Sequence, residues 1–383
     1  MEILLTIHHY LDPNAGAASV TLNLGKEYEK LGIKVSYYSF DNLPEKLPEL
    51  IKSLLFPEFV AIHIKKLVQH NTVDIVDAST GDAWVWGKLW NRSNHGLPVL
   101  ATQSHGLEHV GHVQTLAEAQ RRKQHLSWKY PLYHGGFRLW EVACSMRCSD
   151  LVFMLNQHDA DYAISHLNVD INRVNLISNG IPEAFINLPF EPISESSNSI
   201  LRIVQVGSYI ARKGVQYSVP VLNTILTRYP EVEVSFLGTG CDAEKVYADF
   251  APDVRDRVQV IPSYSHEHLP ALLQGHHILL FPSLSEGFPL AIPEAMACGL
   301  APVSSDIPGP TEIVEHETNG LLIPVRDSQA IEHALEKLIT NRSYLAQLCR
   351  SAYDTAQHYS WAAIAQKRIA IYQAALDRKR QLQ

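Results

Sequence analysis

The chain has 383 residues, 46% of them hydrophobic and 19% charged, a size and composition that fit a globular protein of two domains. Its formal net charge of −8 argues against a nucleic-acid partner. No apolar run approaches the roughly 20 residues needed to cross a bilayer, and the start, MEILLTIHHY, lacks the basic segment and cleavage site of a signal peptide. The five cysteines follow no disulfide framework, so we expect reduced thiols and a cytoplasmic protein.

Strand and helix patterns alternate along the first half of the chain, which is typical of a parallel sheet with crossover helices. Residues 17–31 carry apolar side chains at helical spacing and are followed by Gly32, which predicts an amphipathic helix. These elements predict a Rossmann-like domain over residues 1–185. Its strands are expected at residues 3–7, 33–40, 73–77, 99–102, 151–155 and 174–177.

The pattern restarts after a stretch without periodicity. Residues 186–199 are rich in Pro, Ser and Asn, which is a linker composition. A second Rossmann-like domain is predicted over residues 200–358, and the last segment, residues 359–383, is expected to be mainly an amphipathic helix. A cleft between two such domains is a common ligand site. The strands of the second domain are expected at residues 201–206, 232–237, 258–261, 278–281, 301–303 and 320–324.

One run, SLSEGFPLAIPEAMACG from Ser283 to Gly299, follows a buried-strand pattern and opens into a helix. Ligands of α/β folds bind at such strand ends, where the free N–H groups of the helix suit phosphate and hydroxyl oxygens. Glu286 and Glu294 lie about 12 Å apart if the segment is helical, beyond the roughly 5 to 9.5 Å of a glycosidase acid/base pair. We therefore expect the two carboxylates to hold vicinal hydroxyls on different parts of one ligand. The alternative is one capping and one surface glutamate.

This run resembles the E-x7-E signature of retaining glycosyltransferases of family 4, which have the GT-B fold. The following segment, GLAPVSSDIPGPTEIVEHETNGLLIPVRD, is similar to the one that follows in that family, with Pro310 in place of the second glycine of a Gly-Gly motif. The resemblance covers nearly the whole chain. It implies an α/β protein of two facing Rossmann-like domains, the first on the acceptor side and the second binding a nucleotide-sugar. The C-terminal helix is expected to cross back to the first domain.

The resemblance also implies roles for residues of the second domain. The loop GSYIARKG, residues 207–214, looks like the family's G-R-x-x-x-x-K-G loop, in which cations grip the donor diphosphate. Lys213 matches the family lysine, whereas Ser208 stands where the arginine normally is and Arg212 is an alternative cation. Glu286 is expected to hold the donor sugar and Glu294 the ribose. Further donor contacts are expected from Gly207, from Tyr264 near the base, and from Gly287, Phe288, Pro289 and Leu290 around the sugar.

In the first domain, the resemblance singles out two positions. His105 follows the strand at 99–102 and matches a family histidine beside the donor sugar, so we expect it at the reacting centre with Lys213 and Glu286. The pair Gly16-Ala17 matches the small residues that let the first turn approach the donor phosphate.

The chain has 19 histidines, so clusters of them need a separate test. Residues 105, 109 and 112 are histidines, but their spacing matches no zinc signature. The resemblance implies that no bound metal is needed, so neither a metal nor a cofactor is expected. The stretch His266-Glu267-His268 is expected to be a solvated loop.

The resemblance implies a retaining, metal-independent hexosyltransferase. A UDP-sugar, foremost UDP-glucose, is the expected donor, and the hydroxyl of a glycan or lipid-linked sugar in polysaccharide or exopolysaccharide synthesis is the expected acceptor. A catalytically weak nucleotide-sugar-binding protein, an epimerase and an inverting transferase, with Asp12 or His105 as base, are alternatives. The segment 121–140 is basic and aromatic and lacks Asp and Glu, which suits an anionic membrane surface or an anionic acceptor; ordinary helices are the alternative. Peripheral contact at the inner face of the membrane is therefore an expectation.

Overall fold

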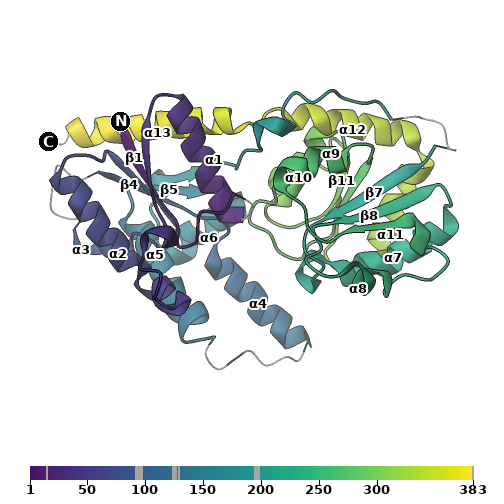
Figure 1. The fold of residues 1–383 in the computed structure, drawn as a ribbon, viewed down its shortest axis with the longest axis horizontal. Helices are drawn as coiled ribbons and strands as arrows, with labels where there is room; N and C mark the ends of the chain where they lie inside the picture. Colours follow the sequence, from purple (N-terminus) through teal and green to yellow (C-terminus); the bar gives the residue numbers. More distant parts are fainter. Residues whose placement is uncertain (14–15, 91–97, 123–126, 128–129, 194–198, 382–383) are drawn as a thin grey trace. The chain divides into compact units, whose positions relative to one another are not determined.

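The computed structural model describes the chain except for residues 14–15, 91–97, 123–126, 128–129, 194–198 and 382–383. The described chain divides into two compact units (Figure 1). Unit 1 comprises Met1–Gly180 and Trp361–Gln383, and unit 2 comprises Ile181–Ser360. Phe190 and Ile193, from the stretch with linker composition, pack against the core of unit 2.

Unit 1 contains a six-stranded parallel sheet of order β2-β1-β3-β4-β5-β6. Its inner strands are apolar runs because helices cover both faces of the sheet. The strands are β1 (Glu2–Thr6), β2 (Lys34–Tyr38), β3 (Ile75–Ser79), β4 (Val99–Gln103), β5 (Leu151–Met154) and β6 (Val174–Leu176). The helices are α1 (Gly16–Lys30), α2 (Glu49–Gln69), α3 (Trp84–Leu89), α4 (Glu108–Arg122), α5 (Arg138–Cys148), α6 (Gln157–Leu167) and α13 (Trp361–Gln381), with short turns η1 (Phe40–Asn42), η2 (Tyr133–Phe137) and η3 (Ile171–Arg173).

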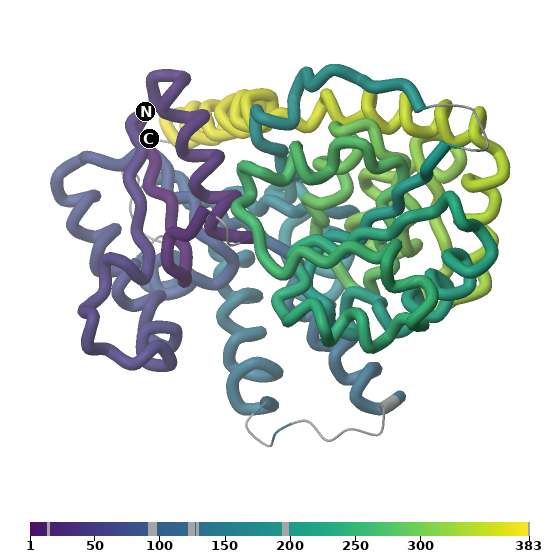
Figure 2. Tube along the Cα trace, turned by 45° about the vertical axis from the view of Figure 1, so that its right-hand side comes forward, coloured from purple at the N-terminus to yellow at the C-terminus, as the bar shows by residue number. Residues whose placement is uncertain are grey.

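The C-terminal helix α13 belongs to unit 1, as the resemblance implied, and packs on α1 and β4 (Figure 2). Its Arg368 is 2% exposed and lies 3.1 Å from Asp77 Oδ2 of β3. The guanidinium also donates to Gln103 Oε1 at 2.6 Å and stacks 4.0 Å from the Phe153 ring. Tyr372 donates a further hydrogen bond to Asp77 at 2.7 Å. A buried ionic network therefore joins the end of the chain to the centre of the first sheet.

Unit 2 contains a second six-stranded parallel sheet, of order β12-β11-β10-β7-β8-β9. Its strands are β7 (Leu201–Val206), β8 (Val232–Leu237), β9 (Val258–Ile261), β10 (Ile278–Phe281), β11 (Ala301–Ser305) and β12 (Leu321–Ile323). Its helices are α7 (Val215–Arg228), α8 (Ala243–Tyr247), α9 (Leu269–Leu273), α10 (Ala291–Ala297), α11 (Ser328–Thr340) and α12 (Arg342–Ala356). The short turns are η4 (Glu183–Phe185), η5 (Ala211–Lys213), η6 (Arg255–Arg257), η7 (His266–His268) and η8 (Pro310–Glu312).

Each sheet reverses its strand order once. In unit 1 the chain passes from β1 to β2 on one side and then to β3 on the other; in unit 2 it builds β7, β8 and β9 before crossing to β10. The carboxyl ends of β1 and β3, and those of β7 and β10, therefore flank the two switch points. Open α/β sheets bind their ligands at such points.

Candidate functional site

Two loops meet at the switch point of unit 2. The loop after β7 contains η5, and the loop after β10 leads to α10. They are joined through the backbone, because Leu284 N donates to Arg212 O at 2.8 Å. Gly214 has a φ of +75°, and a Cβ there would overlap Pro282 O. Only glycine lets the two loops approach this closely.

These loops bring three charged side chains together. Lys213 Nζ lies 2.7 Å from Glu286 Oε1, and Arg212 Nη1 lies 3.3 Å from the same oxygen. The Glu286 side chain is 11% exposed, that of Lys213 17% and that of Arg212 52%. Lys213 also lies 4.9 Å above the ring of Phe281 at the end of β10. Two cations on one carboxylate leave excess positive charge, which suits an anionic ligand.

The first residues of the loop after β7 complete the expected diphosphate site. Gly207 has a φ of +119° and lies against the stem of Lys213. Ser208 is exposed at the start of this loop. Arg212, in contrast, is held by Glu286 and by the carbonyl oxygen of Ser285 at 3.1 Å.

Glu294 lies in the first turn of α10 and is 3% exposed. His266 Nε2 lies 2.8 Å from its Oε1, and this hydrogen bond raises the pKa of His266 against the opposing effect of burial. The expectation of a solvated loop at residues 266–268 is therefore wrong for His266, which is partly buried beside Phe185, with ring centroids 5.9 Å apart. Tyr264 lies beside Gly238 in the same region, and burial raises its pKa to about 12.

The loop between the two glutamates is held by the turn at Gly309. Gly309 has a φ of +93°, and a Cβ there would lie 2.6 Å from Gly287 O. Pro310 begins the turn η8, a position that its fixed φ suits, so this departure from the family pattern fits the local backbone. The side chains of the loop differ in exposure: Phe288 and Pro289 are buried, and Leu290 is partly exposed.

The expected residues of the first domain lie at the strand ends of unit 1. His105 follows β4, and burial lowers its pKa to about 3, so the ring is neutral near pH 7. Gly16 and Ala17 begin α1, and a Cβ at Gly16 would meet no atom within 4 Å among the described residues. Asn14 and Ala15 of the same turn lie outside the described residues. Within the described part of the chain, no group of three or more His, Cys, Asp or Glu side chains is placed to hold a metal ion.

Sequence reasoning missed two sets of polar residues. One is His266, whose partner Glu294 lies on another loop. The other is a cluster around His8, Asp82 and Arg138 in unit 1, where His8 Nδ1 lies 2.7 Å from Asp82 Oδ1. The available signal was positional, because His8 follows β1 and Asp82 follows β3 at the switch point of the first sheet.

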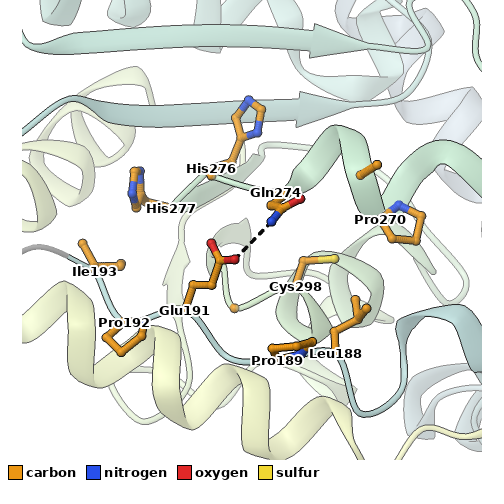
Figure 3. A pocket seen from close by; sticks show the side chains of 13 residues that line it. Leu188, Pro189, Glu191, Pro192, Ile193, Pro270, Gln274, His276, His277 and Cys298 are labelled. Carbon is orange, nitrogen blue, oxygen red and sulfur yellow. Dashed lines mark hydrogen bonds between the residues drawn. The ribbon is translucent and has the colours of Figure 1, made fainter.

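A cavity of about 420 Å³ lies elsewhere in unit 2, at the amino ends of β10 and β11 (Figure 3). Several of its polar side chains have protein partners. Gln274 donates to Glu191 at 3.0 Å, and His276 Nε2 lies 2.9 Å from Ser235 Oγ. His277 Nδ1 accepts from the backbone N–H of Arg202 at 3.0 Å. Because it lies at the amino ends of the strands, the cavity is at the opposite end of the sheet from Lys213 and the two glutamates, which follow the carboxyl ends.

Two family models match the chain. The model described as Glycosyltransferase Family 4 matches residues 14–185, and that described as Glycosyl transferases group 1 matches residues 192–355. D-inositol 3-phosphate glycosyltransferase of Mycobacteroides abscessus is 26% identical over 302 residues, which are 76% of this chain and 65% of that protein. Amylovoran biosynthesis glycosyltransferase AmsK of Erwinia amylovora is 29% identical over 256 residues, 61% of this chain and 60% of that protein. The matches thus span less than two thirds of the length of these relatives.

A solved structure matches over nearly the whole chain. HepE of Anabaena in complex with UDP-glucose has a TM-score of 0.67 and 18% sequence identity, and the match covers 98% of this chain and 100% of HepE. This likeness shows that the two chains share the same fold, in which helices surround two parallel sheets.

Proposed function

The chain belongs to glycosyltransferase family 4 and has its GT-B fold, and we propose that it transfers a hexose from a nucleotide-sugar to a hydroxyl of a glycan or lipid-linked acceptor. The observation that carries the proposal is the charged group at the switch point of unit 2, in which Lys213 and Arg212 meet at Glu286. A UDP-sugar is the favoured donor, above all UDP-glucose, with which HepE was solved. Polysaccharide synthesis is the favoured process, because the relative AmsK is named for it.

Each group of the site has a role in this proposal. Lys213 stabilises the diphosphate as it leaves, and Arg212 or Ser208 assists. Cations that are already in place stabilise such developing charge most effectively. Glu286 turns from the cations to the hydroxyls of the donor sugar, and Glu294 accepts hydrogen bonds from the ribose. His105 contributes a neutral ring at the reacting centre.

The proposed chemistry is a front-face substitution with retention at the anomeric carbon. The bond from this carbon to the diphosphate breaks as the acceptor oxygen attacks on the same face, and the leaving diphosphate takes the proton of that hydroxyl. The charge on the diphosphate is met by Lys213 and Arg212, so the proposed reaction needs no metal ion. The anomeric configuration of the product tests this step, because inversion would contradict it.

The first experiment measures nucleotide diphosphate release from UDP-, GDP- and ADP-sugars. We expect the wild type to hydrolyse one donor slowly, and Lys213→Met to lose about 10²- to 10³-fold in rate, the usual cost of removing one transition-state donor. Glu294→Ala removes the proposed ribose contact and is expected to raise the KM for the same donor. Lys245→Met, an exposed residue of α8, is the control and keeps the wild-type rate. If no donor releases nucleotide and no donor produces a thermal shift, the proposed function is contradicted.

We also propose that residues 121–140 contact the membrane peripherally. None of the helices in the described part of the chain combines the length and hydropathy of a membrane span, so such contact would be at the surface. Leu132, Phe137 and Trp140 are exposed, whereas Arg138 lies inside unit 1 and does not belong to the basic face. Lys123, Trp128 and Lys129 lie outside the described residues.

Liposome co-sedimentation tests this contact. We compare the wild type with a variant carrying Leu132→Ser and Phe137→Ser, on vesicles with and without anionic lipid. The wild type is expected to pellet with anionic vesicles, because exposed apolar side chains enter the interface while basic groups meet the lipid charge. Equal pelleting of both proteins would contradict the proposal.

A further inference from the structure

The cavity of about 420 Å³ in unit 2 is separate from the groups proposed to hold the donor (Figure 3). His276 and His277, which line it, directly precede β10, and Cys298 and Gly299 lie just before β11. Open α/β sheets usually bind their ligands at the opposite, carboxyl ends of the strands. The volume lies in the range of small-molecule sites. A molecule in this cavity is therefore a second ligand and not a part of the donor.

The outer wall of the cavity is the segment 188–193, which is fixed on unit 2. Tyr353 donates a hydrogen bond to the carbonyl oxygen of Leu188 at 2.6 Å, and its ring packs on Phe190 with centroids 5.3 Å apart. Gly299 has a φ of +82°, and a Cβ there would lie 3.3 Å from the Phe190 ring. These contacts hold the wall in place by themselves. The cavity is therefore preformed, as small-molecule sites usually are.

The walls are apolar and rigid. Three prolines, Pro189, Pro192 and Pro270, line the cavity together with Leu188 and Ile193. Proline side chains pack well against flat aromatic rings, and they lose almost no conformational entropy when they are covered. These walls therefore favour a flat ring as the ligand.

The charge of the cavity sets a further condition. Of the thirteen described residues that line it, Glu191 is the one with a formal charge at pH 7. Its Oε1 accepts from Gln274 Nε2 at 3.0 Å, and a carboxylate accepts further hydrogen bonds beside this one. Burial raises the pKa of the Cys298 thiol to about 12, so this group is neutral. An anionic ligand would meet a carboxylate and no cation in the lining, whereas an N–H donor finds an acceptor.

The two histidines differ in what they offer a ligand. Both ring nitrogens of His276 have partners, the carbonyl oxygen of Leu273 at 3.3 Å and Ser235 Oγ at 2.9 Å. His277 Nδ1 accepts from the backbone N–H of Arg202, and burial lowers the pKa of His277 to about 4. A neutral ring whose Nδ1 accepts carries its proton on Nε2. His277 therefore supplies a hydrogen-bond donor, which suits an acceptor atom on the ligand.

We propose that this cavity binds an uncharged, flat nitrogen heterocycle that carries an amide or amino group. The amide or amino N–H donates to Glu191, the ring nitrogen accepts from His277, and the ring packs against the proline side chains. A carboxylate or phosphate in place of the amide is repelled by Glu191. The site is distinct from that of the donor, so the inference does not depend on the proposed transfer reaction.

Nicotinamide, nicotinate and benzamide test these contacts, because they share one shape and differ in charge or in the ring nitrogen. Their Kd values are measured by NMR titration. Nicotinamide is expected to bind with a Kd on the order of 1 mM, as suits so small a molecule. Nicotinate is expected to bind at least about 10-fold more weakly because of its charge, and benzamide about 2- to 10-fold more weakly because it lacks one hydrogen bond. The inference is overturned if nicotinate or benzamide binds as tightly as nicotinamide.

Two variants place the bound molecule in the cavity. Ala271 is an exposed residue of α9 that lines it, so Ala271→Trp fills the space and is expected to weaken nicotinamide binding at least about 10-fold. Ala248→Trp, at an exposed position at the end of α8, is the matched control. Glu191→Gln is expected to reduce the preference for nicotinamide over nicotinate by about 10-fold, whereas Glu244→Gln, an exposed residue of α8, leaves it unchanged.

An unchanged Kd for nicotinamide in Ala271→Trp, with an unchanged melting curve, would overturn the inference. Displacement of nicotinamide by UDP would also overturn it, because the molecule would then lie in the donor site. Donor hydrolysis is expected to proceed at the same rate in Ala271→Trp and the wild type. The proposed function and this second site can therefore fail independently of each other.

Discussion

Single residues of the proposed donor site owe their placement to partners from other loops. Glu294 was predicted from the E-x7-E run, but His266, which contacts it, is 28 residues away and no sequence pattern joins the two. Likewise, the contact of Lys213 with Glu286 spans 73 residues. Sequence spacing identifies side chains on one element, whereas pairs of this kind become visible only once the sheet order places β7 beside β10.

The His266–Glu294 pair predicts a pH dependence of stability. Because the folded state raises the pKa of His266 above its ordinary value of 6.5, its contribution is fully present below pH 6.5 and is lost as the pH rises through the folded-state pKa. We expect His266→Gln to lower the free energy of unfolding by about 1 kcal/mol at pH 6, the range of a partly exposed charge-assisted bond.

The measurement is urea unfolding of both proteins at pH 6 and pH 9, and the difference between them is expected to shrink at pH 9. His268→Gln, an exposed histidine of the same turn, serves as the control with no pH-dependent difference. A constant difference for His266→Gln would mean that the pair is not ionic.

Whole elements were predicted more completely than their contacts. All twelve expected strands are present, because buried parallel strands form apolar runs in the sequence. The expected strand at 73–77 begins and ends two residues later, as β3, Ile75–Ser79; its small final residues, Ala78 and Ser79, give no hydrophobic signal. The π-helical turn before Arg138 was not predicted, since its sequence, YHGGF, has no helical periodicity.

The helix α13 is expected to depend on Arg368. Replacing Arg368 by Met leaves Asp77 buried without its cation, so we expect a loss of about 3 to 5 kcal/mol in the unfolding free energy of unit 1. Lys367→Met, on the exposed side of the same helix, is expected to cost less than about 0.5 kcal/mol.

Denaturant unfolding followed by circular dichroism checks both values. Adding Asp77→Asn to Arg368→Met is expected to recover part of the loss, because an amide at this position no longer buries a charge. Equal stability of Arg368→Met and Lys367→Met would show that the ion pair contributes nothing to the docking of α13.

The molecule as a whole carries several partly buried neutral histidines. Burial lowers the pKa of His105 to about 3 and those of His109, His276 and His277 to about 4. The unfolded chain binds protons at these groups below pH 6.5 and the folded chain does not. Both units should therefore lose stability as the pH falls from about 7 towards 4.

A double variant, His276→Gln with His277→Gln, tests this at the level of the whole protein. Its thermal midpoint is expected to fall less steeply than that of the wild type between pH 7 and pH 5, since each such histidine contributes at most about 1.4 kcal/mol per pH unit. His358→Gln, an exposed histidine of unit 2, should follow the wild-type curve. Parallel curves for the double variant would contradict the prediction.

For the whole molecule, the sequence predicted the fold class. It also predicted that the loop at residues 207–214 and the E-x7-E run each follow a strand of the second sheet, because the preceding strands are apolar and both motifs have family counterparts. The polar cluster of unit 1 could not be predicted from the sequence. His8, Asp82 and Arg138 come from three distant segments, and their charges look ordinary in the chain; only the strand order brings them to one point.

The return of α13 to unit 1 has a consequence for synthesis on the ribosome. Asp77 emerges early, but its partner Tyr372 follows 295 residues later, after every residue of unit 2. Unit 2 is continuous in the chain and can fold during translation, whereas the first sheet must wait with an unneutralised carboxylate at its centre. Domains fold as units during synthesis, so the first-made half of this protein is the last to be completed.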